Sequence, residues 1–319
     1  MFLAAHSSPV STYKRPTKMR RVLGRLRKDK WMYLMLLPGI IYFLIYRYGP
    51  MWFLLTAFME FRPFLGFWQS EWVGLAQFER LFTGFSFWTV FQNTLILSLL
   101  QIIFNFPLPI IFALMINEVK FTPFKRTVQT ITYMPNFLSW TIVAGMTIVL
   151  FTSDGGLINE AVYRLGFGRV NFLANESALR PMIVGQSMWR NTGWGTIIYL
   201  AAITGVDTEL FEAARIDGAN RMQQLWHITL PCIRPTIVIL FILNLGNIMD
   251  ANFEQMINMI NPLNRSVGEV FDTYVWRVGI NAGQFSYATA VGLFRSVVGL
   301  ILVIAADRLA KFCGEEGLL

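Results

Sequence analysis

The sequence predicts an all-α, polytopic membrane protein with six transmembrane helices, on the basis of its composition, its long apolar stretches and its distribution of basic residues. Of the 319 residues, 55% are hydrophobic and only 14% are charged, whereas a water-soluble protein carries about a quarter charged residues. A helix needs about 20 residues to cross the hydrocarbon core of a bilayer. Six stretches meet that length, and they lie near 32–57, 88–115, 128–151, 182–204, 236–258 and 286–307.

A basic arm, residues 1–31, precedes a six-helix transmembrane domain that we predict to occupy residues 32–319. Nine of the 27 lysines and arginines lie between Lys14 and Lys30, directly before the first apolar stretch. We interpret this arm as a cytoplasmic topology signal that contacts membrane lipid, and we expect no nucleic-acid partner. The first apolar stretch is too long for a signal-peptide core and has no small-residue cleavage site after it, so it is predicted to remain as an anchor.

The remaining basic residues predict that the N- and C-termini are both cytoplasmic. In that orientation, seventeen lysines and arginines lie on the cytoplasmic side and seven, all arginine, lie in the three outside loops. The other three, Arg47, Arg190 and Arg295, fall within the predicted spans. The loop 205–235 is then cytoplasmic.

Helix-breaking residues interrupt two of the spans. Pro107 and Pro109 lie in the second span, and Gly193 and Gly195 lie in the fourth. Such residues are tolerated in packed membrane helices, so both stretches are still predicted to cross the membrane.

The loop 205–235 is predicted to fold into two short helices around a turn. Asp207 or Thr208 can cap the first helix, and Gly218 permits a sharp change of direction. The second helix is amphipathic at helical spacing. The pair Leu230–Pro231 is predicted to end it, and Pro235 is predicted to start the fifth span.

A helix that lies on the lipid surface would account for the amphipathic pattern of this loop. It would not account for the small residues, which leave the segment thin enough for the backbone of another protein to approach closely. The residues of this loop that a surface helix does not account for are Glu212, Ala213, Ala214, Asp217, Gly218, Ala219, Leu230 and Pro231.

At these eight positions and at the usual spacing, the chain resembles the EAA signature of type I ABC importer permeases. The resemblance implies that the loop is a coupling helix, which docks into a cleft on a cytoplasmic ATPase. It also implies the permease fold and a location in the bacterial cytoplasmic (inner) membrane.

The resemblance covers nearly the whole chain and is to the sugar-uptake branch, with Asp207 to Phe211 before the signature. The run Tyr133 to Trp140 and the run Ala288 to Phe294 look like the third and last spans of a subgroup that imports complex oligosaccharides. This implies an importer of alginate or pectin-like oligosaccharides. The family's eight-span maltose permeases differ, because this chain lacks their extra spans and large outside domain.

The chain contains no GxxxxGK[ST] stretch, and none of its seven lysines follows a glycine, so it carries no P-loop. We therefore expect a transport subunit rather than an enzyme, with no cofactor of its own, and with ATP and Mg²⁺ bound by a partner ATPase. The resemblance implies two cytoplasmic ABC ATPase subunits, an external solute-binding protein and a second, homologous permease subunit that completes a heterodimer.

Polar residues within the predicted spans indicate a substrate pathway, because charges are costly in a bilayer and usually face a cavity or a partner. At 1.5 Å per residue, Arg190 and Arg295 lie about 14 Å from the outer ends of their spans. On a helical fifth span, Asn244, Asn247, Asp250, Glu254 and Asn258 would form one polar stripe about 120° wide. The predicted pathway consists of Arg190, Trp189, Trp194, Asn244, Asn247, Asp250 and Arg295.

Two alternatives stay open. Arg190 or Arg295 can instead bond Asp250, Glu254 or backbone carbonyls and hold the helices together. An ion-gradient-driven secondary transporter of a polar solute would use Asp250 and Glu254 as coupling-ion residues, but it leaves the EAA-like loop unexplained.

Overall fold

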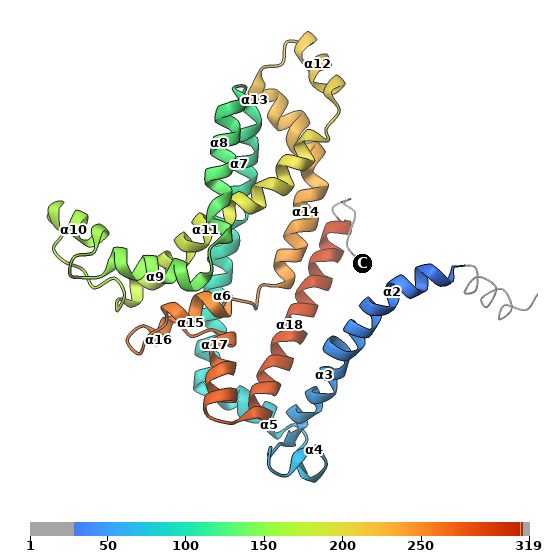
Figure 1. The fold of residues 1–319 in the computed structure, drawn as a ribbon, viewed down its shortest axis with the longest axis vertical. Helices are drawn as coiled ribbons and strands as arrows, with labels where there is room; N and C mark the ends of the chain where they lie inside the picture. The colour runs from blue at the N-terminus through green and yellow to red at the C-terminus, as the bar shows by residue number, and fades with distance from the viewer. Residues whose placement is uncertain (1–28, 313, 315–319) are drawn as a thin grey trace, which may run out of the picture. The chain divides into compact units, whose positions relative to one another are not determined.

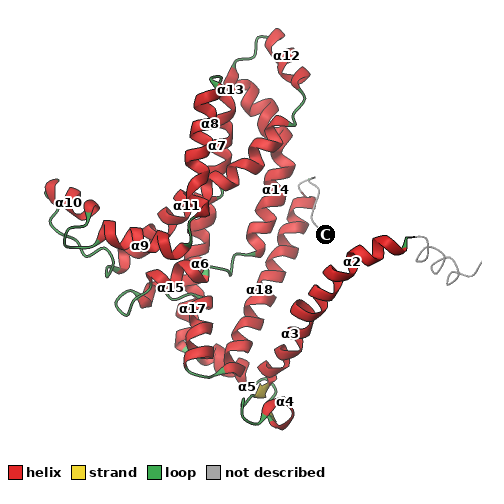
Figure 2. Cartoon of the chain, viewed as in Figure 1, coloured by secondary structure: helices red, strands yellow, loops and turns green. Residues whose placement is uncertain are grey.

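The structure is a computed structural model that describes residues 29–312 and 314, and these are mostly helical (Figure 1, Figure 2). The chain divides into two compact units, residues 1–55 and 56–319. Except for its last three residues, the predicted basic arm lies outside the described residues.

The described residues of the first unit form one long helical run. It consists of α2 (Lys30–Phe43), the π-helical turn η1 (Leu44–Tyr48), α3 (Gly49–Met51) and the beginning of the 3₁₀ helix η2 (Trp52–Phe58). The run of 29 residues is long and apolar enough to cross a membrane. This confirms the helix that the sequence predicts at 32–57.

The second unit opens with a two-stranded antiparallel ribbon. Strand β1 (Met59–Glu60) pairs with β2 (Glu71–Trp72), with Met59 opposite Trp72. The short helix α4 (Gly66–Gln69) connects the two strands, and α5 (Ala76–Thr83) follows them.

Two long helical runs correspond to the second and sixth predicted spans. Helices α6 (Phe85–Asn105) and α7 (Pro107–Glu118) form one run of 34 residues, and α18 (Phe285–Phe312) has 28. Both runs are apolar enough to span a membrane. Pro107 lies at the start of α7, where its missing N–H costs little.

The stretch 128–151, predicted as one transmembrane helix, is not one continuous helix. Helix α8 (Thr122–Tyr133) and the 3₁₀ turn η3 (Met134–Phe137) are bent by 100° from α9 (Trp140–Phe151). The helix restarts because Ser139 is extended and its side chain accepts a hydrogen bond from the Ile142 N–H at 3.3 Å. The pair can be a broken span or a re-entrant loop.

Helix α10 (Leu157–Arg164) is followed by α11 (Glu176–Thr204), which contains the predicted fourth span. A Cβ at Gly193 would lie 2.1 Å from the Thr132 carbonyl oxygen. Only glycine therefore lets α11 pack this closely on α8.

Within the described residues, four helices are long and apolar enough to cross a membrane, or five if the bent pair counts as one span. Helix α11 has the length but is not among them, because polar residues such as Gln186 and Asn191 interrupt its apolar surface. The count of six spans stays a prediction.

The loop predicted as two helices forms α12 (Thr208–Ile216) and α13 (Arg221–Gln224). The prediction that Leu230–Pro231 ends the second helix is wrong. The helix continues through the π-helical turn η4 (Leu225–Thr229) into α14 (Leu230–Gly246), so Pro235 lies inside a helix rather than at its start. A π-helical turn shifts the hydrogen-bond register, which accommodates a proline without ending the helix.

The predicted fifth span, 236–258, is not one helix. Helix α14 ends at Gly246, and α15 (Phe253–Met259) begins after a non-helical segment, residues 247–252. Asn252 has a left-handed backbone (φ 56°), and its side chain caps α15 by accepting from the Gln255 N–H at 3.3 Å. The predicted polar stripe through Asn258 is therefore wrong, because the 100° periodicity is lost at the break.

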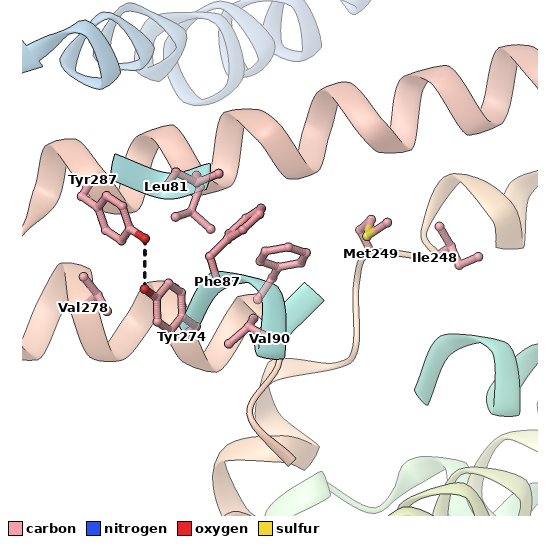
Figure 3. Packing of buried hydrophobic residues seen from close by; sticks show 10 residues of the cluster. Leu81, Phe87, Val90, Ile248, Met249, Tyr274, Val278 and Tyr287 are labelled. Atoms are coloured by element: carbon pink, nitrogen blue, oxygen red, sulfur yellow. Dashed lines mark hydrogen bonds between the residues drawn. The ribbon is translucent and has the colours of Figure 1, made fainter. Parts of the chain in front are cut away.

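Three short elements precede α18: helices α16 (Arg265–Gly268) and α17 (Phe271–Val275) and the π-helical turn η5 (Trp276–Asn281). Helix α17 and the turn η5 join the non-helical segment in one core cluster that is rich in aromatic side chains (Figure 3). In it the hydroxyls of Tyr274 and Tyr287 lie 3.1 Å apart. The buried members are Leu81, Phe87, Val90, Ile248, Met249, Phe271, Tyr274, Val278, Tyr287 and Val291.

Candidate functional site

The EAA-like loop and the end of α7 lie at the same end of the second unit (Figure 1). An ion pair joins Nη1 of Arg221 to Oε2 of Glu118 at 3.3 Å. The two loops that the sequence assigns to the cytoplasmic side, 117–127 and 205–235, are therefore neighbours.

Local sequence fixes both ends of α12. Oδ1 of Asp207 accepts a hydrogen bond from the Glu209 N–H at 2.9 Å, so Asp207 is the N-cap. At the other end, the N–H of Ala219 donates to the Ala214 carbonyl at 2.8 Å, and the N–H of Gly218 donates to the Arg215 carbonyl at 3.1 Å. This pair of bonds is a Schellman motif. It needs a left-handed residue, and Gly218 supplies it with φ +82°.

A capping box that the sequence analysis missed starts the next helix. Oδ1 of Asn220 accepts from the Gln223 N–H at 2.9 Å, and Oε1 of Gln223 accepts from the Asn220 N–H at 2.7 Å. The sequence does contain the signal for this capping box, which is an N-cap residue followed three positions later by glutamine. The turn at residues 217–220 is thus rigid on both sides.

The structure separates the eight predicted coupling residues into two groups. Most lie on α12 and the following turn, which together with the end of α7 enclose a hollow of about 840 Å³. Leu230 instead packs into a core cluster with Ala113 and Tyr199. The exposed members are Glu212, Ala213, Asp217, Gly218 and Pro231, whereas Ala214, Ala219 and Leu230 are half-buried.

A polar cavity of about 350 Å³ lies between α6, α7, α11 and the broken end of α14. It brings together four predicted pathway residues, Trp194, Asn244, Asn247 and Asp250. Other polar residues on its wall were not predicted. These are Ser98, Gln101, Asn105, Asn136 and Asn191.

Amide side chains dominate the polar part of this wall, and amides both donate and accept hydrogen bonds. Among the described residues, Oδ1 of Asn105 is buried without a hydrogen-bond partner. A buried acceptor without a partner is unfavourable. The half-exposed Trp194 offers an aromatic face to the same space.

Arg190, which the sequence places in the pathway, holds the bend between η3 and α9. Its Nε donates to the Leu138 carbonyl at 2.9 Å, and its guanidinium lies 4.6 Å from the ring centre of Trp140. Its Nη1 also donates to Oδ1 of Asn191, a cavity residue, at 3.1 Å. Arg190 thus lies behind the cavity wall rather than in it.

Trp189 lines a separate groove of about 460 Å³ between α7, α8 and α11, which is mostly apolar. The structure therefore does not bring Trp189 to the polar cavity that contains Trp194.

Arg295 lies between two aspartates at the end of the cavity. Its Nη2 is 3.1 Å from Oδ2 of Asp250, and its Nη1 donates to Oδ1 of Asp272. The pair with Asp250 was one of the alternatives that the sequence left open. Asp272 was not predicted to take part, because it lies outside the predicted spans.

Comparison with known proteins identifies the relatives of this chain. The family model described as the binding-protein-dependent transport system inner membrane component matches residues 105–313. Two curated relatives from Bacillus subtilis (strain 168) resemble this chain over nearly their whole length. The chain is 52% identical to the polygalacturonan/rhamnogalacturonan transport system permease protein YteP, over 94% of each chain, and 51% identical to the protein LplB, over 93% of each.

Two solved structures share the fold. One is a bacterial ABC transporter involved in the import of the acidic polysaccharide alginate, with a TM-score of 0.85, 38% identity, and coverage of 91% of this chain and 98% of that one. The other is a bacterial alginate ABC transporter in complex with an alginate pentasaccharide-bound periplasmic protein. It has a TM-score of 0.86, 37% identity, and coverage of 93% of this chain and 100% of that one.

Proposed function

The chain belongs to the family of binding-protein-dependent transport system inner membrane components, and we propose that it forms the translocation pathway of an ATP-driven importer of acidic oligosaccharides. As a permease subunit of a sugar ABC importer, it is a transport component and not an enzyme. Family membership also sets aside the ion-gradient-driven secondary transporter.

The observation that carries the proposal is the amide-lined cavity with Trp194 on its wall. Saccharide hydroxyls need many donors and acceptors close together, and an aromatic ring can pack against the apolar face of a sugar. The proposed pathway consists of the cavity residues Trp194, Asn244, Asn247 and Asp250, with Arg295 behind Asp250. Arg190 and Trp189 would lie outside the pathway and support its wall.

The relatives support an acidic cargo of the pectin or alginate type. YteP is a permease for polygalacturonan and rhamnogalacturonan, and the structural neighbours import alginate. All of these polymers carry sugar carboxylates, so we propose a uronate oligosaccharide as the substrate.

Energy would enter through the turn that carries Gly218. The eight EAA-like residues would dock on a partner ATPase, which binds ATP and Mg²⁺. We propose that the complete importer contains two such ATPases, a second homologous permease, and a solute-binding protein outside. The alginate-bound periplasmic protein in the neighbouring structure supports the last of these partners.

The same proposal fixes the membrane arrangement. Residues 32–319 would form one domain with six spans in the bacterial cytoplasmic membrane, and residues 1–31 would form a basic arm in the cytoplasm. The bent pair α8–α9 and the polar helix α11 would supply the two spans that composition alone does not identify. Both termini would then lie in the cytoplasm.

Uptake from a defined mixture tests the substrate class. The importer, reconstituted in vesicles with its ATPases, its second permease and its binding protein, is offered equal amounts of trigalacturonate, trimannuronate and maltotriose. We expect uptake of at least one of the two uronates and none of the neutral maltotriose, measured by mass spectrometry of the vesicle contents. Uptake of maltotriose without either uronate would contradict the proposal.

A further inference from the structure

The ion cluster around Arg295 lies where the wall of the cavity meets α17 and α18. One guanidinium contacts two carboxylates, those of Asp250 and Asp272. With all three groups ionised, the cluster carries one negative charge in excess. Since each carboxylate repels the other, the guanidinium holds them together against that repulsion.

The two aspartates are not equivalent. The side chain of Asp272 is 15% exposed, and its Oδ2 also accepts the Ala251 N–H at 3.3 Å. The side chain of Asp250 is 52% exposed and lines the cavity. Among the described residues, its carboxylate forms an ion pair with Arg295 and accepts no hydrogen bond from another residue. Asp272 is thus the fixed counter-ion, and Asp250 is the exposed one.

The backbone around Asp250 allows its side chain to move away. Residues 247–252 are non-helical, and Figure 3 shows Ile248 and Met249 on this stretch. The segment is held by other contacts, since Oγ of Ser98 donates to the Ile248 carbonyl. Withdrawal of the Asp250 carboxylate would therefore leave the segment in place and break no helix.

We propose that the carboxylate of an acidic sugar in the cavity replaces Asp250 at Nη2 of Arg295, while Asp272 stays bound at Nη1. This inference rests on the proposed function, since it requires an acidic cargo. A guanidinium is suited to the exchange because its planar fork binds carboxylates with directed hydrogen bonds. Arg190 is not suited to this exchange, because its Nε already donates a hydrogen bond to the Leu138 carbonyl at the bend.

The exchange gives Asp250 a defined role. Transport requires a site that binds its cargo firmly enough to accept it and weakly enough to release it. Asp250 competes with the cargo for Arg295, and thereby limits the affinity for carboxylates. A neutral sugar has no charge with which to displace Asp250, so the pair also discriminates against it.

Equilibrium binding to the purified importer complex, without nucleotide and without the binding protein, tests this. Calorimetry compares trigalacturonate with its fully methyl-esterified form, which keeps the chain and removes the charges. Arg295→Gln should weaken trigalacturonate binding about tenfold or more, because a hydrogen bond to a charged group is lost. Asp250→Asn should strengthen it severalfold. Both variants should change binding of the ester less than binding of trigalacturonate, because the ester has no carboxylate that competes with Asp250.

Arg277→Gln is the matched control. Arg277 forms an ion pair with Glu269, at 2.6 Å from its Nε, and these hydrogen bonds raise the pKa of Arg277 above its usual value. The pair does not line the cavity, so its loss should leave binding of both ligands unchanged.

Equal effects of Arg295→Gln on both ligands, or weaker trigalacturonate binding by Asp250→Asn, would overturn the exchange. Asp250→Asn keeps the pair of Arg295 with Asp272, so it decides the question if Arg295→Gln fails to assemble. Uptake of uronates by the unaltered importer tests the proposed function separately. An importer that takes up uronates but shows no charge discrimination in these variants would retain the function and lose the exchange.

Discussion

The two arginines of the predicted spans differ in what their guanidinium groups contact. Arg190 donates to a backbone carbonyl and stacks on Trp140, whereas Arg295 contacts two carboxylates, one of them on the cavity wall. The sequence places both residues at the same depth in the membrane, because depth is counted in residues along the helix. Such a count does not show which groups each side chain contacts. The amide-rich wall of the cavity was not predicted either, since single polar residues such as Gln101 and Asn105 give no recognisable pattern in apolar helices.

At the residue scale, we expect Arg190→Gln to destabilise the importer rather than change its selectivity. The variant loses the bond to the Leu138 carbonyl and the cation–π contact, which together contribute about 1–3 kcal/mol. Its thermal midpoint should fall, and uptake of all cargoes should fall in parallel. Arg190→Lys keeps the charge but not the planar fork, so it should behave like the glutamine variant. A selective loss of uronate uptake at unchanged stability would instead place Arg190 in contact with the cargo.

At the scale of elements, the first helix and the turn of the EAA-like loop were predicted correctly, whereas the end of its second helix and the breaks inside the spans were not. An aspartate is a common helix cap and a glycine readily adopts a left-handed backbone. The roles of Asp207 and Gly218 at the two ends of α12 can therefore be predicted from sequence. At the breaks after Gly246 and at Leu138, the local caps Asn252 and Ser139 are combined with hydrogen bonds to the distant residues Asp272 and Arg190, which the sequence pattern does not reveal. Hydropathy measures how apolar a stretch is and says nothing about where its helix bends.

The turn at Gly218 gives a prediction at this scale. Its φ of +82° costs a residue with a side chain about 1–2 kcal/mol, although no atom lies within 4 Å of the added Cβ. Gly218→Trp should therefore spare folding and insertion but displace α12 and add bulk at the proposed docking site of the ATPase. Uptake and substrate-stimulated ATP hydrolysis should both fall severely.

Gly155, in the loop between α9 and α10, offers a matched control. It has φ +80° and equally open space. Gly155→Trp should carry the same backbone strain and leave ATP-driven uptake nearly intact. Full uptake by Gly218→Trp, or equal losses in the two variants, would show that the turn has no special part in coupling.

At the scale of the whole molecule, the chain has the fold of an importer permease, with a polar cavity between its helices and a rigid turn at one end. The cavity lies between α6, α7, α11 and α14, and the turn lies between α12 and α13. Helix α14 runs in one piece from the loop helix α13 to the cavity wall at Asn244. A displacement of the loop would thus be transmitted along a continuous helix.

We propose that ATP hydrolysis on the side of this turn drives uptake through the cavity. The direct measurement is uptake of radiolabelled trigalacturonate by vesicles that contain the complete importer and enclose ATP, with the binding protein outside. Orthovanadate, which arrests ABC ATPases, should stop uptake, and an ionophore that collapses ion gradients should leave the rate unchanged. Uptake that survives vanadate and stops with the ionophore would contradict the account.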